Sequence, residues 1–126
     1  MPAHIGEASI TVRFQREGFH AWPDAPRSRG YLQQRHRHLF HYEVTVNLNM
    51  NDKARYIEFH DLLNHAWAHS NKEWGDLPCE DIAASISRNL CEDLRRDVVV
   101  TAWEDNECGA TAWHHWEDDD EDETLD

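Results

Sequence analysis

RHRHLFHYEVTV, residues 35–46, is the segment from which the architecture of this chain can be built. From Phe40 onward its apolar residues occupy every second position and polar residues lie between them, which is typical of a β-strand with one buried face. His36 and His38 share the parity of the apolar residues, so both imidazoles are expected on the buried face. Their backbones are expected about 7 Å apart at about 3.3 Å per residue, a spacing from which two rings can reach one ion.

An earlier segment supplies a third histidine. Residues 8–16 also alternate, which predicts a strand, and their apolar parity reaches His20 if the strand continues regularly to that point. If the two strands form a hairpin, His20 lies beside His36 and His38. Three neutral imidazoles with an open fourth position suit a catalytic zinc ion (Zn2+). The alternative is that these histidines belong to the surface or to ordinary packing.

The rest of the chain predicts two helices followed by two strands. Apolar residues recur every three or four positions in both helices, and Glu80 and Asp81 lie in the first turn of the second, where acids suit the helix dipole. The expected segments are helices at 61–71 and 80–94 and strands at 98–104 and 110–116. The order β-β-α-α-β-β predicts an α+β fold, with a four-stranded antiparallel sheet and two helices on one face.

Length, charge and cysteine content restrict the class of protein. A chain of 126 residues suits a single domain, expected over residues 1–116. Its formal net charge of −13 argues against a nucleic acid as partner, and no apolar run approaches the roughly 20 residues of a membrane span. Three unclustered cysteines, and an N-terminal segment without the layout of a signal peptide, predict a cytoplasmic protein, in the host cytoplasm if the chain is viral.

The acidic residues are concentrated at one end of the sequence. Residues 117–126 include eight of them and almost no apolar side chains, which predicts a disordered acidic tail. The expected role of this tail is solubility, and the alternative is contact with a basic partner.

Four segments carry a resemblance to a known family. They are GFHAWPDAP (18–26), RHRHLFHYEVTV (35–46), LPCEDIA (77–83) and WEDNECGAT (103–111). Together with the order of elements, they make the chain similar to the tunnelling-fold (T-fold) family of 6-pyruvoyl-tetrahydropterin synthase and of 6-carboxy-tetrahydropterin synthase, the enzyme of the queuosine pathway. Within that family the chain looks most like small, divergent members from phage genomes.

The resemblance implies roles for five residues. In the family, one histidine from the end of the first strand and two from an H-x-H at the start of the second hold zinc, which implies His20, His36 and His38. A glutamate of the third strand grips the 2-amino and N3 edge of the pterin; its match here is Glu104, which without the resemblance would be expected as a solvated strand-end acid. Glu80 matches the glutamate of the family's P-T-x-E segment and is expected at the ligand, the alternative being a charge that only serves the helix terminus.

The resemblance also implies an assembly. Family members close their sheets into barrels by oligomerising, with active sites at subunit interfaces, so a homo-oligomer is expected, either a hexamer or a tetramer. Two features of the sequence agree with this expectation. A lone four-stranded sheet has edges that need cover, and six tryptophans could supply apolar interface.

The chain departs from the family at the catalytic base. These enzymes carry a catalytic cysteine about four residues before the H-x-H, where this chain has Leu32. An Asp-His pair that tunes the base is matched, in one of two possible placements, by Asn64 and His65, and asparagine holds no charge beside an imidazole. The candidate bases are therefore His65, His69 and Cys79, the last if the start of a helix lowers its pKa.

Three hypotheses about function follow. The first is a zinc-dependent lyase of the 6-pyruvoyl- or 6-carboxy-tetrahydropterin synthase type, which acts on a substrate like 7,8-dihydroneopterin triphosphate in a pterin or 7-deazaguanine pathway. The second is a catalytically degenerate T-fold protein that binds or sequesters a purine-like, pterin-like or nucleotide ligand. The third is a structural or assembly protein that inherited the fold and uses its histidines otherwise.

Overall fold

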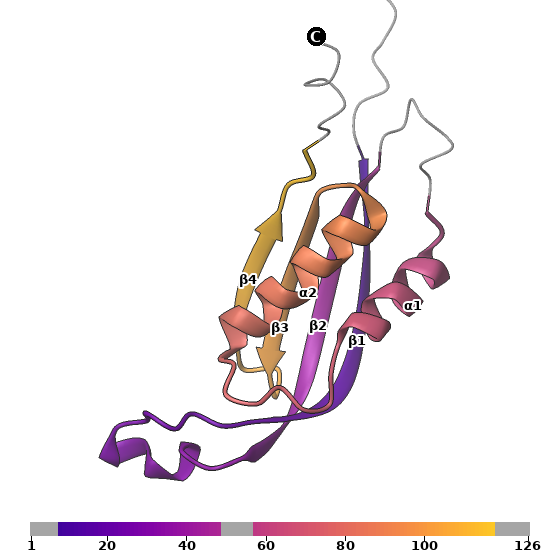
Figure 1. The fold of residues 1–126 in the computed structure, drawn as a ribbon. Helices are drawn as coiled ribbons and strands as arrows, with labels where there is room; N and C mark the ends of the chain where they lie inside the picture. The colour runs from indigo at the N-terminus through magenta and orange to yellow at the C-terminus, as the bar shows by residue number, and fades with distance from the viewer. Residues whose placement is uncertain (1–7, 49–56, 118–126) are drawn as a thin grey trace, which may run out of the picture.

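Two helices cover one face of a four-stranded antiparallel sheet with the strand order β1-β2-β3-β4 (Figure 1). The computed structural model describes residues 8–48 and 57–117. The elements are β1 (Ala8–His20), the 3-10 segment η1 (Arg27–Leu32), β2 (His36–Leu48), α1 (Phe59–His69), α2 (Cys79–Leu94), β3 (Val98–Glu104) and β4 (Cys108–His114). The predicted α+β fold and the order β-β-α-α-β-β are confirmed.

Strand β1 continues regularly to His20, four residues past the end of the segment in which alternation is clearest. It does so because β2 offers a backbone partner along its whole length, from Ala8 opposite Leu48 to His20 opposite His36. The apolar parity of β1 therefore reaches its last residue, and the predicted long hairpin is present.

The turn between β3 and β4 is tighter than the predicted five residues. Asp105 and Asn106 both have positive φ, a conformation that aspartate and asparagine tolerate better than most residues. Because these two residues reverse the chain, Cys108 already pairs with Glu104, and β4 begins two residues earlier than expected. The acidic tail predicted over residues 117–126 lies outside the described residues except for Glu117.

The core lies between the sheet and the two helices. Alternate residues of β2 are completely buried there, and α2 contributes residues at helical spacing that face them. The fully buried large apolar side chains are Phe40, Tyr42, Val44, Val46, Leu62, Ile82, Ile86, Leu90, Val98 and Val100. The parity that buries Phe40 and Tyr42 is also the parity of His36 and His38, so the core fixes the side of the sheet on which these histidines lie.

The linker between α1 and α2 extends the sheet at one point. It runs beside the end of β1, where Phe19 and Glu73 form a parallel bridge. The Phe19 N–H donates to the Lys72 carbonyl at 2.8 Å, and the Trp74 N–H donates to the Phe19 carbonyl at 2.8 Å. The linker is thereby held against the last residues of β1, next to His20.

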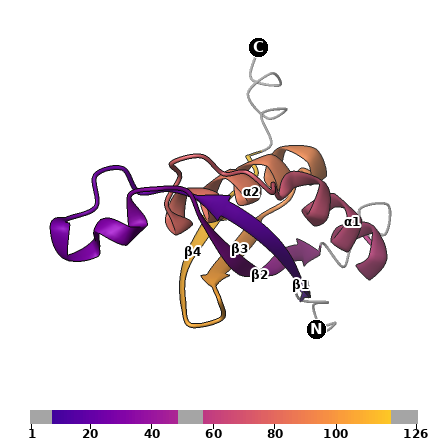
Figure 2. The same cartoon turned by 90° about the horizontal axis from the view of Figure 1, so that it is seen from below.

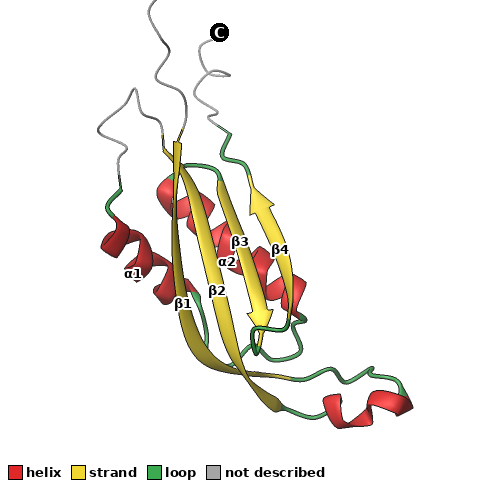
Figure 3. Cartoon of the chain, turned by 180° about the vertical axis from the view of Figure 1, so that it is seen from behind, coloured by secondary structure: helices red, strands yellow, loops and turns green. Residues whose placement is uncertain are grey.

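The segment 21–35, which contains η1, projects beyond the end of the sheet in both side and end views (Figures 1 and 2). The face of the sheet opposite α1 and α2 has no described helix over it (Figure 3), and Val99 and Trp113, which pair across β3 and β4, are exposed. Among the described residues, no helix is long and apolar enough to cross a membrane.

Gly18 is required by close packing of β1 on the core. A Cβ at this position would lie 2.7 Å from Cδ2 of Phe40, whose side chain is fully buried and cannot withdraw freely. We expect Gly18→Ala to lower the free energy of unfolding by about 1–3 kcal/mol, the usual effect of overpacking a core.

Urea denaturation measures this change. Gly30→Ala is the matched control, since a Cβ there meets nothing within 4 Å, and its effect is expected to stay within about 0.5 kcal/mol. Equal effects of the two substitutions would contradict the packing argument.

Candidate metal centre

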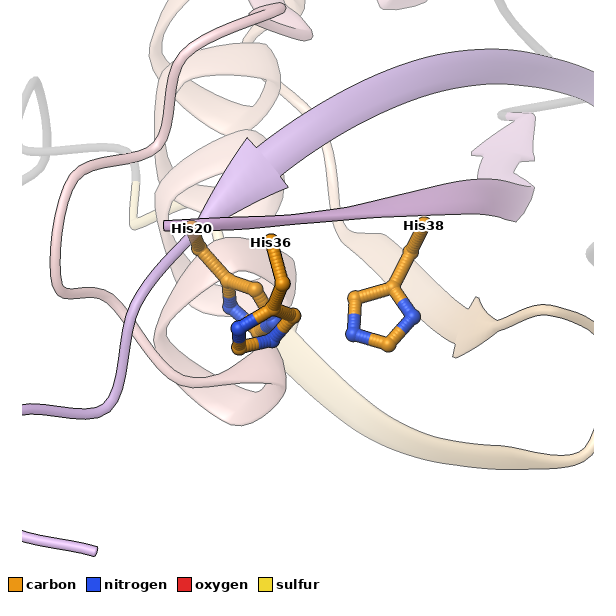
Figure 4. A group of neighbouring side chains, drawn as sticks. All are labelled: His20, His36 and His38. Atoms are coloured by element: carbon orange, nitrogen blue, oxygen red, sulfur yellow. The ribbon is translucent and has the colours of Figure 1, made fainter. Parts of the chain in front are cut away.

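Three histidines converge at the end of the β1–β2 hairpin. His20 is the last residue of β1 and pairs with His36, the first residue of β2, while His38 pairs with Gly18 two residues further along. The ring centroids are 4.6 Å apart for His20 and His36, 4.8 Å for His36 and His38, and 5.0 Å for His20 and His38. Figure 4 shows the three rings on the same side of the two strands, and one nitrogen of each ring lies within 4.8 Å of the corresponding nitrogens of the others.

One nitrogen of each ring is anchored by a hydrogen bond. In all three histidines Nδ1 lies within hydrogen-bond distance of an oxygen that can only accept, so Nδ1 carries the proton. The pairs are His20 with the Leu77 carbonyl at 2.9 Å, His36 with the Gln34 carbonyl at 2.9 Å, and His38 with Oδ2 of Asp105 at 2.6 Å. These hydrogen bonds at Nδ1 orient the three rings. In each neutral imidazole, Nε2 then keeps a lone pair, as it does in the histidine ligands of protein metal sites.

In His20 and His38 the free nitrogen, Nε2, faces an acceptor rather than a donor. Nε2 of His38 is buried and has no hydrogen-bond partner. Nε2 of His20 lies 3.3 Å from one carboxylate oxygen of Glu104, and Nε2 of His38 lies 3.8 Å from the other. Lone pairs that converge without a donor are unfavourable unless a cation lies between them. The three imidazoles therefore fit a divalent metal ion, and nitrogen ligands of this kind suit zinc.

Burial keeps the most enclosed histidine neutral. His20 is only 7% exposed, and burial lowers its pKa, an effect that the hydrogen bond to the Leu77 carbonyl and the charge of Glu104 partly oppose. The hydrogen bond from His38 lowers the pKa of Asp105, so this carboxyl group remains a charged acceptor. Neutral imidazole is the form that binds a metal ion.

A cavity of about 550 Å³ opens beside the histidines, within the range of small-molecule sites. Its walls come from the end of β1 and the residues just after it, from the last residue of η1, from the start of β2 and the end of β3, and from the linker that leads into the start of α2. The lining residues are His20, Ala21, Trp22, Leu32, His36, Asp76, Pro78, Cys79, Glu80 and Glu104. Both carboxylates predicted to contact a ligand, Glu80 and Glu104, thus border one cavity together with two of the three histidines.

Solved structures identify the architecture around this cavity. The chain matches a variant of the Plasmodium vivax 6-pyruvoyltetrahydropterin synthase in which a catalytic glutamate is replaced by alanine, with a TM-score of 0.65 and 15% identity over 87% of this chain and 99% of that one. It matches the Plasmodium falciparum enzyme with a TM-score of 0.61 and 14% identity over 86% and 98% of the two chains. The chain has the fold of 6-pyruvoyl tetrahydropterin synthases. No protein-family model matches it, and no curated protein sequence matches it significantly.

Within this synthase fold, Cys79 is a half-buried thiol rather than a thiolate. Its Sγ donates to the Ala102 carbonyl at 3.1 Å. Burial, with a further contribution from the charge of Glu104, raises the pKa of Cys79 to about 12. The start of α2 therefore does not lower this pKa, which was the condition for Cys79 to act as a base.

The two candidate bases on α1, His65 and His69, do not line the cavity. His65 is exposed, and His69 contacts Asp93, which lies near the end of α2 that is remote from Cys79. Because α2 has sixteen residues, that end is about 24 Å from its start. Leu32, at the position of the family's cysteine, does line the cavity and presents an apolar side chain.

Asp105 is the residue of this site that the sequence analysis missed. It was expected only as part of a turn, yet its Oδ2 accepts from His38, its Oδ1 accepts from the Leu39 N–H at 2.8 Å, and its own N–H donates to the Leu39 carbonyl at 3.0 Å. An aspartate directly after the strand-end Glu104 is the one signal that could have indicated it. The Leu77 carbonyl is a backbone group and leaves no signal in the sequence.

Asp105→Asn tests the anchoring of His38. Asparagine tolerates the positive φ of this position, but its amide cannot bind the Leu39 N–H and also accept from Nδ1 of His38. We expect zinc affinity to fall by about 10–100-fold, the usual effect of losing such a contact, in competition with a chelating dye.

Asp24→Asn is the control, since it removes the same charge from an exposed position that does not line the cavity. Zinc affinity is expected to be unchanged in this variant. An Asp105→Asn protein that binds zinc as the wild type does would show that the hydrogen bond does not position the ring.

Proposed function

We propose that this protein is a zinc-dependent lyase of the 6-pyruvoyl- or 6-carboxy-tetrahydropterin synthase type, acting on a substrate like 7,8-dihydroneopterin triphosphate. The observation that carries the proposal is the set of three imidazoles with anchored Nδ1 and unpartnered or acceptor-facing Nε2, beside a cavity bordered by carboxylates. A site built only to pack histidines would pair their nitrogens with donors and acceptors of the protein.

His20, His36 and His38 would hold the zinc ion. The buried, unpartnered Nε2 of His38 supports this assignment, because a metal ion would satisfy it. When bound, zinc would supply Lewis-acid polarisation of oxygens on the substrate's side chain. The hydrogen bonds at Nδ1 would keep the three rings directed at the ion, and burial, which lowers the pKa of His20, would keep that ring neutral.

Glu104 and Glu80 would hold the heterocycle. The carboxylate of Glu104 is 28% exposed at the cavity and can accept two parallel hydrogen bonds from an edge that presents an amino group and a ring N–H. Glu80, at the start of α2, borders the same cavity, and Trp22 adds an aromatic surface on which a flat ring can stack. These contacts suit a pterin or another purine-like bicyclic ring.

Proton transfer is the step for which this chain differs most from the family. The catalytic residue replaced in the similar Plasmodium vivax structures is a glutamate, so a carboxylate serves catalysis in one protein of this fold. Within one subunit, the carboxylates of the cavity besides Glu104 are Asp76 and Glu80, and they are our candidates for the proton acceptor. His65 and His69 remain candidates only for a site that a neighbouring subunit completes.

A second candidate function is binding of the same heterocycle without turnover. It is favoured by the apolar side chain of Leu32 where the family carries its cysteine, and by the protonated thiol of Cys79. Such a protein would retain the metal and the ring-binding carboxylates and would sequester its ligand.

An activity assay separates the two candidates. We expect one zinc per subunit in purified wild-type protein and release of inorganic triphosphate when it is incubated with 7,8-dihydroneopterin triphosphate. His38→Ala is expected to lose both zinc and release, because two imidazoles hold zinc poorly. His41→Ala is the matched control on β2, because alternation places His41 on the opposite face of the sheet from His38. The His41→Ala protein is expected to retain zinc and activity.

The outcomes decide between the functions. Stoichiometric zinc and substrate binding without triphosphate release would contradict the lyase and support sequestration. A wild-type protein that takes up no zinc would contradict both.

We also propose that the chain forms a homo-oligomer. Both edge strands of the sheet, β1 and β4, have one strand neighbour each, and Trp113 is 61% exposed on the face that no described helix covers. Unpaired strand edges and exposed aromatic side chains favour association. Light scattering at micromolar concentration is expected to give a mass several times the 14.9 kDa of one chain, and a monodisperse monomer would refute the proposal.

A further inference from the structure

Glu104 approaches the histidines more closely than the binding of a heterocycle requires. It ends β3, opposite Phe40 of β2, and its carboxylate reaches 3.3 Å from Nε2 of His20 and 3.8 Å from Nε2 of His38. No lysine or arginine of the described residues lies within ion-pair distance of this carboxylate. Among the described side chains, the basic groups within 4 Å of it are the imidazoles of His20 and His38.

The 3.3 Å separation matches that of two ligands of one ion. Atoms bound about 2.0–2.1 Å from a tetrahedral zinc lie about 3.4 Å from each other. The ligand nitrogens of the three histidines lie within 4.8 Å of one another. The Glu104 carboxylate lies 3.3 Å from Nε2 of His20 and 3.8 Å from Nε2 of His38, so its distances to these nitrogens are within the same range. The position of Glu104 is therefore that of a ligand as much as that of a neighbour.

The hydrogen-bond pattern agrees. The ring protons of His20 and His38 are taken by the Leu77 carbonyl and by Asp105, so both Nε2 atoms present lone pairs toward Glu104. A carboxylate and two imidazole lone pairs do not attract one another. A single divalent cation between them satisfies all three groups.

We propose that Glu104 is the fourth ligand of the metal ion while the cavity is empty, so that the resting site has three imidazoles and one carboxylate. The inference rests on the metal-binding part of the proposed function and adds a constraint to it. A carboxylate that gives both oxygens to the edge of a heterocycle cannot also bind the metal ion. Binding of the ring therefore removes Glu104 from the ion and opens the fourth position only when a ligand is present.

Cobalt binding tests this without any heterocycle. Co2+ is titrated into metal-free wild type, Glu104→Gln and Glu107→Gln, and its visible absorption reports both affinity and coordination. Glu104→Gln is expected to bind Co2+ at least about tenfold more weakly and to show a shifted absorption spectrum at saturation. The reason is that losing a direct ligand weakens metal binding more than losing a hydrogen bond to a ligand, which itself costs about 10–100-fold in affinity. Glu107→Gln removes the same charge from the adjacent exposed turn and is expected to match the wild type.

The spectrum separates coordination from simple charge attraction. If the saturated spectra of wild type and Glu104→Gln coincide, or if their affinities are equal, Glu104 is not a ligand and the inference fails. In that case Co2+ binding that is lost in His38→Ala would still support the triad, so the proposed function would survive. Absence of Co2+ binding in the wild type would overturn both.

X-ray absorption of the zinc-loaded wild type gives a second test that needs no variant. Three imidazoles with a bound carboxylate are expected in the protein without ligand. Three imidazoles whose remaining position holds only water would overturn the inference.

Discussion

The antiparallel pairing of His20 with His36, at the end of a hairpin thirteen residues long on each side, is the contact on which the geometry of the site depends. In a β-sheet a register shift of one residue moves every side chain to the other face. The buried alternation of β2 prevents such a shift, because it would expose Phe40 and Tyr42 and bury polar side chains. The free energy that holds the core together therefore also holds the three imidazoles on one side.

Orientation of the rings needs more than the hairpin. Their Nδ1 atoms are held by three different segments: the linker between the helices, the end of the segment 21–35, and the turn after β3. The linker is fixed by its bridge to Phe19, and the turn is fixed by the paired hydrogen bonds between Asp105 and Leu39. Segments distant in sequence thus set the direction of each lone pair, and the result is a pocket of acceptors that suits a cation.

The similarity to 6-pyruvoyltetrahydropterin synthases is one of fold, and the site shows where this chain follows that architecture and where it departs. Its histidines, Glu104 and the cavity lie together. The side chains available for proton transfer are limited, because Leu32 is apolar and the half-buried thiol of Cys79 has a raised pKa. If Glu104 covers the fourth position of the metal ion until a ring is bound, it keeps water from that position. This would hold both for an enzyme and for a protein that only retains its ligand.

Alternation is a local property, so the sequence alone determined the strands, the parity of His36 and His38, and the order of elements that defines the fold. It also placed Glu104 at the end of its strand. The parity of His20 also needed the pairing of β1 with β2, which keeps the strand regular to its last residue. The anchoring of His20 by a residue 57 positions away and of His38 by one 67 positions away was decided only by the tertiary structure. The same holds for the approach of Glu104 to the imidazoles, the raised pKa of Cys79 and the placement of His65 and His69 away from the cavity. These features depend on which distant groups packing brings together and on how much water it excludes, and neither is encoded in the spacing of residues along one segment.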